Sequence, residues 1–143
     1  MDKICKTNSI SMRKAINKFG SICYYNDNNE LHREDGPAME RTDGSKFWYK
    51  NGLYHREDGP AREYADGDKY WYKNGKRHRK NGPAIEYGNG NKFWYKNGKI
   101  HREDGPAIEF VNDAKEYYYY NDIEYPGIKT NEEWIRFIKL VVS

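Results

Sequence analysis

Cysteine and long apolar runs are both scarce in this chain, and their scarcity excludes several classes of protein. The 143 residues include only two cysteines, Cys5 and Cys23, whereas small secreted domains stapled by disulfides carry many more. No stretch approaches the ~20 apolar residues of a membrane span, and residues 1–20 lack the apolar core of a signal peptide. We therefore expect a protein without a transmembrane segment, located in the reducing cytoplasm.

Most of the chain also lacks an excess of charges of one sign. The net charge is +3, and residues 1–20 already hold five basic residues against one acidic residue. A nucleic-acid-binding protein typically carries a basic stripe along its binding face, and the remainder of the chain as a whole has none. Aromatic residues are plentiful, at 16% of the sequence with 14 Tyr and 4 Trp. Such a chain is too aromatic for disorder and is expected to bury rings rather than a thick aliphatic core.

What the sequence does contain is a repeat. Trp48, Trp71 and Trp94 lie 23 residues apart. Four histidines and the arginines that follow them keep the same interval: His32, His55, His78 and His101, with Arg33, Arg56, Arg79 and Arg102. A period between 20 and 50 residues is the signature of a repeat architecture. We predict an N-terminal segment over residues 1–20, 23-residue repeats over residues 21–122, and a C-terminal cap over residues 123–143.

Each repeat contains two turn signals separated by short runs of strand-forming residues. The Asn-Gly pairs that begin at Asn51, Asn74 and Asn97 are the strongest short signal for a β-hairpin. A second Asp-Gly or Asn-Gly pair begins at residues 43, 66 and 89. The runs between them are rich in aromatic and β-branched residues. The predicted fold is all-β: one elongated antiparallel meander of stacked hairpins, with two strands per repeat.

Alternation along each strand assigns the aromatic side chains to two faces. One face carries a Phe or Tyr followed two residues later by another Tyr, and we expect this face to form the core. The other face carries tryptophans between lysines, whose stems should cover half of each ring. Partly exposed Trp and Tyr are typical of binding hot spots. The predicted contacts for a protein partner are therefore Trp48, Trp71, Trp94, Tyr49, Tyr72 and Tyr95.

Short helices are predicted at both ends of the sheet. Residues 12, 15, 16 and 19 are apolar at helical spacing, and Ser9 or Ser11 can cap them. Toward the other end, Thr130 and Glu133 fit a capping box ahead of an apolar helical face over residues 130–141. We expect this second helix to close the open end of the sheet, with docking of a partner as the alternative.

The phrase that organises the repeat is Trp71-Tyr72-Lys73-Asn74-Gly75-Lys76-Arg77-His78. It resembles the MORN repeat, which builds a hairpin around a phrase of the form Trp-Lys-Asn-Gly-Lys-x-His-Gly, and the resemblance covers about residues 24–122. Where the usual phrase has Gly after His, this chain has Arg. The resulting His-Arg-x-x-Gly-Pro-Ala variant looks like repeat proteins encoded by large DNA viruses and some phages. The resemblance implies a scaffold, a self-associating module or a peripheral lipid binder, in the host cytoplasm if the protein is viral.

The repeated histidines and glutamates do not predict a catalytic or metal site. Equivalent residues two strands apart are separated by roughly 10 Å, whereas zinc ligands all lie about 2 Å from the metal. The same spacing argues against a glycosidase carboxylate pair, which needs about 5 to 9.5 Å and a raised pKa on one member. We expect each His and Arg to hold the Asp-Gly-Pro turn by hydrogen bonds. We predict no enzyme activity, no cofactor and no metal.

One copy of the repeat departs from the others in charge. Lys80-Asn81 replaces the Glu-Asp of the other copies, within a basic cluster made of Lys76, Arg77, His78, Arg79 and Lys80. Residues 76–98 hold six basic residues and one acidic residue, whereas residues 99–122 hold three basic and six acidic residues. The two regions can complement each other, between repeats or between two copies of the chain. Alternatively, the cluster is a site for an acidic protein surface, a lipid headgroup or a phosphate.

These observations predict a non-enzymatic protein–protein interaction module or scaffold. Its partner is another protein, of viral or host origin if the chain is viral, or a second copy of the chain in a homodimer. The alternatives are nucleic-acid or nucleotide binding through aromatic stacking and the basic cluster, or a self-assembling structural component. An anionic lipid is a further candidate partner.

Overall fold

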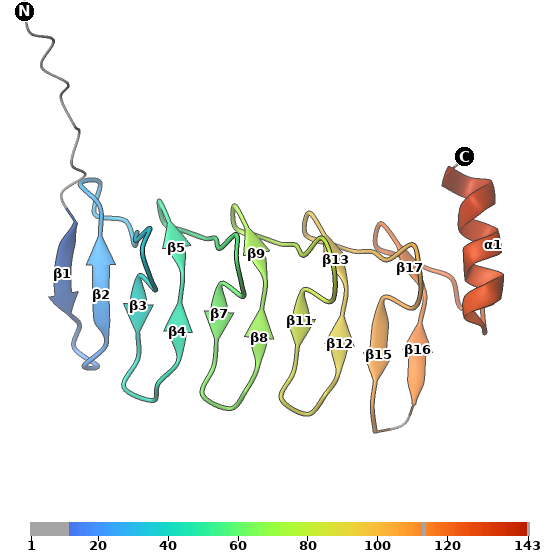
Figure 1. Ribbon diagram of the computed structural model, residues 1–143, viewed down its shortest axis with the longest axis horizontal. Coiled ribbons are helices and arrows are strands. Elements are labelled where there is room, and N and C mark those ends of the chain that lie inside the picture. Colours follow the sequence, from blue (N-terminus) through green and yellow to red (C-terminus); the bar gives the residue numbers. More distant parts are fainter. Residues whose placement is uncertain (1–11, 113, 143) are drawn as a thin grey trace, which may run out of the picture.

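The structure is a computed structural model that describes residues 12–112 and 114–142. Ten strands form one antiparallel sheet, and each pairs with the next of the ten along the chain (Figure 1). This is the predicted all-β repeat meander. In order across the sheet the strands are β1 (Arg13–Ile16), β2 (Ile22–Tyr25), β3 (Met39–Glu40), β4 (Lys46–Phe47), β7 (Arg62–Glu63), β8 (Lys69–Tyr70), β11 (Ile85–Glu86), β12 (Lys92–Phe93), β15 (Ile108–Phe110) and β16 (Lys115–Tyr117).

Each repeat also contains a second, smaller hairpin, so four short strands replace the two that the turn signals predicted. These hairpins are β5 (Tyr49–Lys50) with β6 (Leu53–Tyr54), β9 (Tyr72–Lys73) with β10 (Lys76–Arg77), β13 (Tyr95–Lys96) with β14 (Lys99–Ile100), and β17 (Tyr119–Tyr120) with β18 (Ile123–Glu124). The Asn-Gly pairs form their turns, with φ of +48° at Asn51 and +73° at Gly52. Positive φ at both central residues is the requirement of a type I′ turn.

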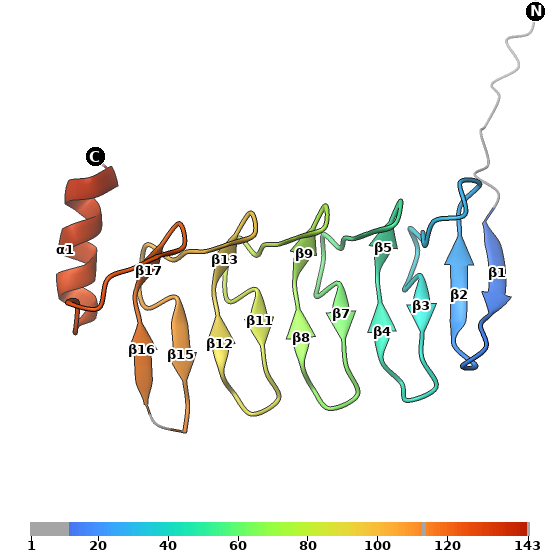
Figure 2. The same cartoon turned by 180° about the vertical axis from the view of Figure 1, so that it is seen from behind.

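The molecule is an elongated row of hairpins with a helix at one end (Figures 1 and 2). No second layer of the described elements covers the sheet, and most of its strands are two residues long. Such short ladders supply few backbone hydrogen bonds, so the side chains between neighbouring repeats must supply much of the stability. No helix in the described part of the chain is long and apolar enough to cross a membrane.

A continuous row of aromatic rings crosses one face of the sheet. Neighbouring ring centroids are 5.4 to 5.9 Å apart and the ring planes are inclined by 71° to 90°. Edge-to-face contacts of this kind contribute about 0.5–1.5 kcal/mol each beyond the area that they bury. This aromatic row is made of Phe47, Tyr64, Tyr70, Tyr87, Phe93, Phe110 and Tyr117. Phe47 is fully buried and the other six rings are half-buried.

The opposite face of the sheet is charged and keeps its strands in register. Lys46, Lys69 and Lys92 each stand directly between two glutamates of the neighbouring strands. Opposite charges placed across a strand pair stabilise it by about 0.2–1 kcal/mol. A register slip of one residue would move these charges onto the aromatic face, so the alternation fixes the pairing.

The predicted N-terminal helix is wrong. Residues 13–16 form β1, which pairs with β2 from Arg13↔Tyr25 to Ile16↔Ile22; Ser9 and Ser11 lie outside the described residues. The apolar positions fit helical spacing, but an isolated helix of this length is marginal in water. Pairing with β2 instead satisfies backbone groups that would otherwise form an open sheet edge. A turn at Gly20, with φ of +80°, returns the chain into β2.

The predicted C-terminal helix is present as α1 (Asn131–Val142). The backbone N–H of Glu133 donates to Thr130 Oγ1 over 3.2 Å, and the N–H of Thr130 donates back to the Glu133 carboxylate over 3.3 Å, which is a capping box. Trp134 and Ile138 are buried against Tyr118 of the last repeat. The helix therefore covers the end of the sheet, as expected.

We predict that Trp134→Ala lowers the free energy of unfolding by about 3–5 kcal/mol, the usual cost of deleting a large buried ring. The side chain is completely buried, and its Nε1–H donates to the carbonyl oxygen of Arg102 over 3.2 Å. The measurement is urea denaturation followed by circular dichroism. Leu140→Ala on the same helix, at a side chain that is 78% exposed, should change stability by less than about 0.5 kcal/mol. Equal effects of the two substitutions would contradict the packing described above.

Candidate functional site

The candidate site is built from four loops that begin at the repeated histidines. We call residues 32–38, 55–61, 78–84 and 101–107 the first to fourth arginine loops. In each one the arginine guanidinium stacks on an aromatic ring of the preceding strand segment. The guanidinium carbon lies 3.9 to 4.1 Å from the ring centroid, for Arg33 on Tyr24, Arg56 on Trp48, Arg79 on Trp71 and Arg102 on Trp94. The cover on each Trp ring is thus an arginine guanidinium and not the lysine stems that we predicted.

Each stacked arginine also donates to a backbone carbonyl oxygen of its own loop, and most of them also bond two carboxylates. In the second loop, Arg56 Nε donates to Asp58 over 2.8 Å, and one Nη donates to the Pro60 carbonyl oxygen and the Glu63 carboxylate. Arg33 and Arg102 make the same contact with the aspartate two residues later, at 2.7 Å. A Cβ at Gly59 would lie 2.8 Å from the Arg56 guanidinium carbon. A side chain at this position would therefore push the guanidinium out of its place on the ring.

The histidines connect each loop to the next repeat. The backbone N–H groups of Asn51, Asn74 and Asn97 donate to Nδ1 of the histidine in the preceding repeat, at 3.0 to 3.1 Å. A ring that accepts at Nδ1 carries its proton on Nε2, and His55 directs this nitrogen to Glu57 at 3.1 Å. His101 Nε2 contacts Glu103 at 2.9 Å. The arginines hold their own turn, as predicted, whereas the histidines hold the next Asn-Gly turn.

The third arginine loop keeps the stack but lacks two of these contacts. Arg79 donates to the Pro83 carbonyl oxygen and to Glu86. Because Lys80 and Asn81 occupy the positions of Glu and Asp, Arg79 Nε and His78 Nε2 have no hydrogen-bond acceptor in the described part of the chain. The Arg79 side chain is 29% exposed, against 20–21% for the other three arginines.

Two grooves lie between consecutive arginine loops. The Trp48 groove, of about 640 Å³, separates the first and second loops, and acidic residues of both loops line it. The Trp94 groove, of about 610 Å³, separates the third and fourth loops, with Lys80 and Lys96 opposite Glu103 and Asp104. The two grooves are alike in shape and differ mainly in the charge of the first of their two loops.

The predicted binding residues fall on both faces of the sheet. Trp48 and Trp94 are half-buried and line the grooves. Tyr49, Tyr72 and Tyr95 lie two residues beyond members of the aromatic row, and alternation assigns them to the face opposite to the tryptophans. Tyr95 nevertheless also lines the Trp94 groove. Tyr72 is only 8% exposed, whereas the other two are half-buried. The six residues therefore do not form one surface.

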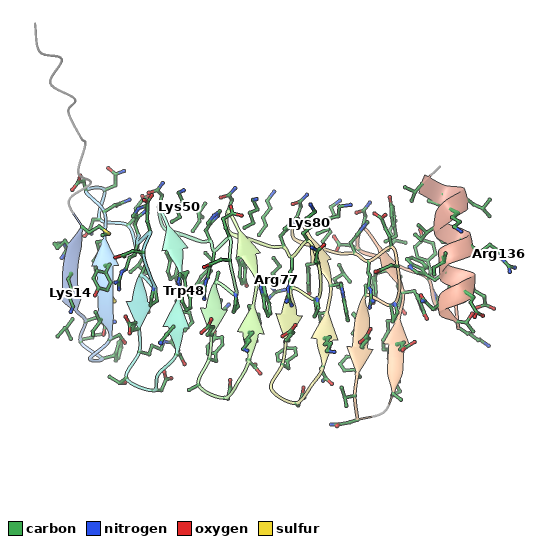
Figure 3. All side chains as sticks on the ribbon, viewed as in Figure 1. Lys14, Trp48, Lys50, Arg77, Lys80 and Arg136 are labelled. Carbon is green, nitrogen blue, oxygen red and sulfur yellow. The ribbon has the colours of Figure 1, made fainter. Side chains whose placement is uncertain are left out.

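The predicted basic cluster is also divided. Lys76 and Lys80 are exposed; Lys80 lies with Lys50 near the edge formed by the Asn-Gly turns (Figure 3). Arg77 instead packs on the ring of Tyr95, with the guanidinium carbon 5.2 Å from its centroid. His78 and Arg79 are held by the contacts given above. Of the five residues, only Lys76 and Lys80 are therefore exposed and without a bond to another described residue.

The repeated glutamates and two of the tyrosines are engaged by their surroundings. The repeated glutamates are bonded to arginines, and burial raises the pKa of Tyr49 and Tyr70 above the usual range for a phenol. Neither phenol is thereby activated as a base at neutral pH. Across residues 12–112 and 114–142, no three His, Cys, Asp or Glu side chains are grouped closely enough to hold a metal ion.

Arg62 is an unusual residue that the sequence reasoning missed. It occupies the position of Met39, Ile85 and Ile108 in the other repeats. Its guanidinium lies among the rings of Tyr54, Tyr64 and Tyr70 at 4.9 to 5.1 Å, and its Nε is buried without a hydrogen-bond partner. Aligning the copies by their period would have revealed a charge in an otherwise apolar column.

No family model, no curated protein and no solved structure matches this chain. The resemblance to MORN repeats therefore remains a prediction from the repeated phrase.

We predict that Arg56→Lys lowers the free energy of unfolding by about 1–3 kcal/mol. Lysine keeps the charge but loses the planar fork that stacks on Trp48 and bonds Asp58 and Glu63 together. Thermal and urea denaturation measure the effect. Arg136→Lys, at an exposed arginine that points outward from α1 (Figure 3), is the matched control and should be nearly neutral. A neutral Arg56→Lys would show that the stack carries no stability.

We also predict a pH dependence from the loop aspartates. Hydrogen bonds from Arg33 and Arg56 lower the pKa of Asp35 and Asp58. Their contribution to stability is therefore present above the ordinary aspartate pKa of about 3.9 and is lost as the pH falls through the lowered values. Calorimetry between pH 7 and pH 2 should show a smaller fall in melting temperature for Asp35→Asn/Asp58→Asn than for the unaltered chain. Asp27→Asn, outside the arginine loops, should follow the unaltered chain.

Proposed function

We propose that this chain is a non-enzymatic protein-interaction module that contacts its partner along the grooves between the arginine loops. One observation carries the proposal: Trp48 and Trp94 are half-buried in concave surfaces whose walls are held by hydrogen bonds and ion pairs. Tryptophan in such a setting is the residue most enriched among interface hot spots.

The rigidity of the grooves supports this function. Each Trp ring is already held against a guanidinium, so binding does not have to order it. Avoiding that cost is the main way in which a preformed surface gains affinity. Tyr49 and Tyr72 line neither groove, so we assign the partner contacts to the tryptophan side, where Tyr95 also borders the Trp94 groove.

The resemblance to MORN repeats supports the same class of function, because that family supplies scaffolds and self-associating modules. For a viral member of that group, the partner is a viral or host protein of the cytoplasm. Association with a second copy of the chain falls within the proposal, since a groove accepts any protein surface of matching shape and charge.

The test is affinity capture from cell lysate with Trp48→Phe/Trp94→Phe beside the unaltered chain. Phenylalanine keeps a ring beneath each arginine but removes the indole edge that faces the groove. We expect the double variant to remain folded by circular dichroism and to retain about tenfold less partner, because tenfold corresponds to about 1.4 kcal/mol at a hot spot. Tyr64→Phe/Tyr117→Phe, on the opposite face, is the control and should retain the partner in full.

Nuclease treatment of half of each sample separates the alternatives. Partners that survive nuclease and depend on the tryptophans support the proposal. Partners that vanish with nuclease would overturn it in favour of nucleic-acid binding, and recovery of the chain alone would favour self-assembly. Equal retention by the tryptophan variant and the unaltered chain would place the contact surface elsewhere.

A further inference from the structure

The third arginine loop has two hydrogen-bond donors without an acceptor among the described residues. The second and fourth loops provide both acceptors internally, and the first provides the one for its arginine, since its His32 Nε2 lies 3.9 Å from Glu34. In the second and fourth loops the histidine Nε2 meets a Glu carboxylate at 3.1 and 2.9 Å. In the first, second and fourth loops the arginine Nε meets an Asp carboxylate at 2.7 to 2.8 Å. Among the described residues, His78 Nε2 and Arg79 Nε have neither.

The surroundings of these donors also differ from those of the other loops. A positive side chain, Lys80, stands where the other loops have a glutamate. Gly82 adopts φ of +128°, whereas its counterparts in the other three loops are outside the positive region. Because the donors lie beside the Trp94 groove of about 610 Å³, a ligand can reach them from solvent.

We propose that the Trp94 groove binds an acidic segment of a partner protein, whose two neighbouring carboxylates occupy the places that Glu and Asp fill in the other three loops. One carboxylate accepts from His78 Nε2 and the other from Arg79 Nε, while Lys80 adds a third contact and, with Arg79, a second positive charge. This inference rests on the proposed function and identifies the chemistry of the partner.

Carboxylates fit the groove better than a continuous polyanion does. The sister loops show that adjacent Glu and Asp side chains reach both donors at hydrogen-bonding distance, and charge-assisted bonds of this kind are the strong ones. The far wall of the groove carries Glu103 and Asp104. Both are already paired, Glu103 with Lys96 and His101 and Asp104 with Arg102. The described residues of the far wall therefore offer no uncommitted cation to the next phosphates of a nucleic acid, whereas a short acidic pair needs only the groups of the third loop.

A second copy of the chain is a poorer occupant for this groove. The aspartates of its own acidic pairs, such as Asp35 in the first loop and Asp58 in the second, are already bonded to the arginines of the same loops. If these carboxylates bonded to His78 and Arg79 of another molecule, they would lose one hydrogen bond for each one that they gain. The groove therefore favours a partner with an uncommitted acidic pair.

The experiment titrates the labelled protein with a synthetic peptide, Gly-Ser-Glu-Asp-Gly-Ser, and follows the arginine Nε–H signals by ¹H–¹⁵N NMR. We expect a saturable shift at Arg79, with Arg33 and Arg56, which do not line the Trp94 groove, unmoved as internal controls. The peptide Gly-Ser-Gln-Asn-Gly-Ser should bind at least tenfold more weakly. Inorganic phosphate and a short oligonucleotide are titrated in parallel, and tighter binding of either one at Arg79 would overturn the inference.

Lys80→Glu/Asn81→Asp restores the sequence of the other loops and should weaken peptide binding at least tenfold without loss of the fold. Lys129→Glu/Asn112→Asp makes the same change in charge outside the groove and should bind normally. Conversely, Glu34→Lys/Asp35→Asn copies the third loop into the Trp48 groove and should create a second site, seen as a shift at Arg33. If the first two variants bound the peptide equally well, the loss of binding would be due to net charge alone, and the inference would be overturned.

This titration separates the inference from the function on which it rests. A chain that ignores the acidic peptide, yet captures partners through Trp48 and Trp94, would overturn the acidic-segment inference alone. A chain that captures no protein in lysate would overturn the proposed function, whatever the peptide does.

Discussion

The stacking of an arginine on an aromatic ring is the interaction on which this fold most depends. A single sheet with strands of two residues cannot bury a two-sided core. The guanidinium takes the place of a second layer: it covers the ring, ties the loop beneath it and reaches the glutamate of the next strand. The guanidinium needs both its charge and its planarity, because it bonds a carboxylate and stacks on an aromatic ring at the same time. The same contacts leave half of each ring available to a partner.

The second constraint is that each repeat is bonded only to the repeats directly before and after it. His32, His55 and His78 each accept from the Asn-Gly turn of the following repeat, and the backbone N–H of Gly52, Gly75 and Gly98 each reaches a carbonyl oxygen in the preceding one. Arrays of this kind behave as one-dimensional chains of units, so their ends need separate solutions. β1 supplies one end, and α1 supplies the other by placing Trp134 over Tyr118 at 5.5 Å between ring centroids, where the inner repeats have an arginine.

The period, the turns and the C-terminal helix could be predicted from sequence because each has a local cause. Asn51-Gly52 needs only its own φ angles, and Thr130 with Glu133 needs only its own turn. The N-terminal helix failed because β1 exists through pairing with β2, which helical spacing cannot reveal. The cover on Trp48 was misassigned because the sequence neighbours are lysines, while Arg56 returns to the ring through a hairpin. The two unfilled donors of the third loop appear only when the copies are compared in space.

Because each repeat contacts only its neighbours, the gene can gain or lose whole repeats. Unequal recombination between two copies would insert or delete one 23-residue unit and rejoin a seam that makes the same His–Asn, Arg–Glu and ring–ring contacts as before. The length of the array is therefore free to drift while its ends stay fixed. Within it, one unit can lose an internal contact, as the third has done, without disturbing the units on either side. New specificities can thus arise one copy at a time, with the remaining copies preserving the fold.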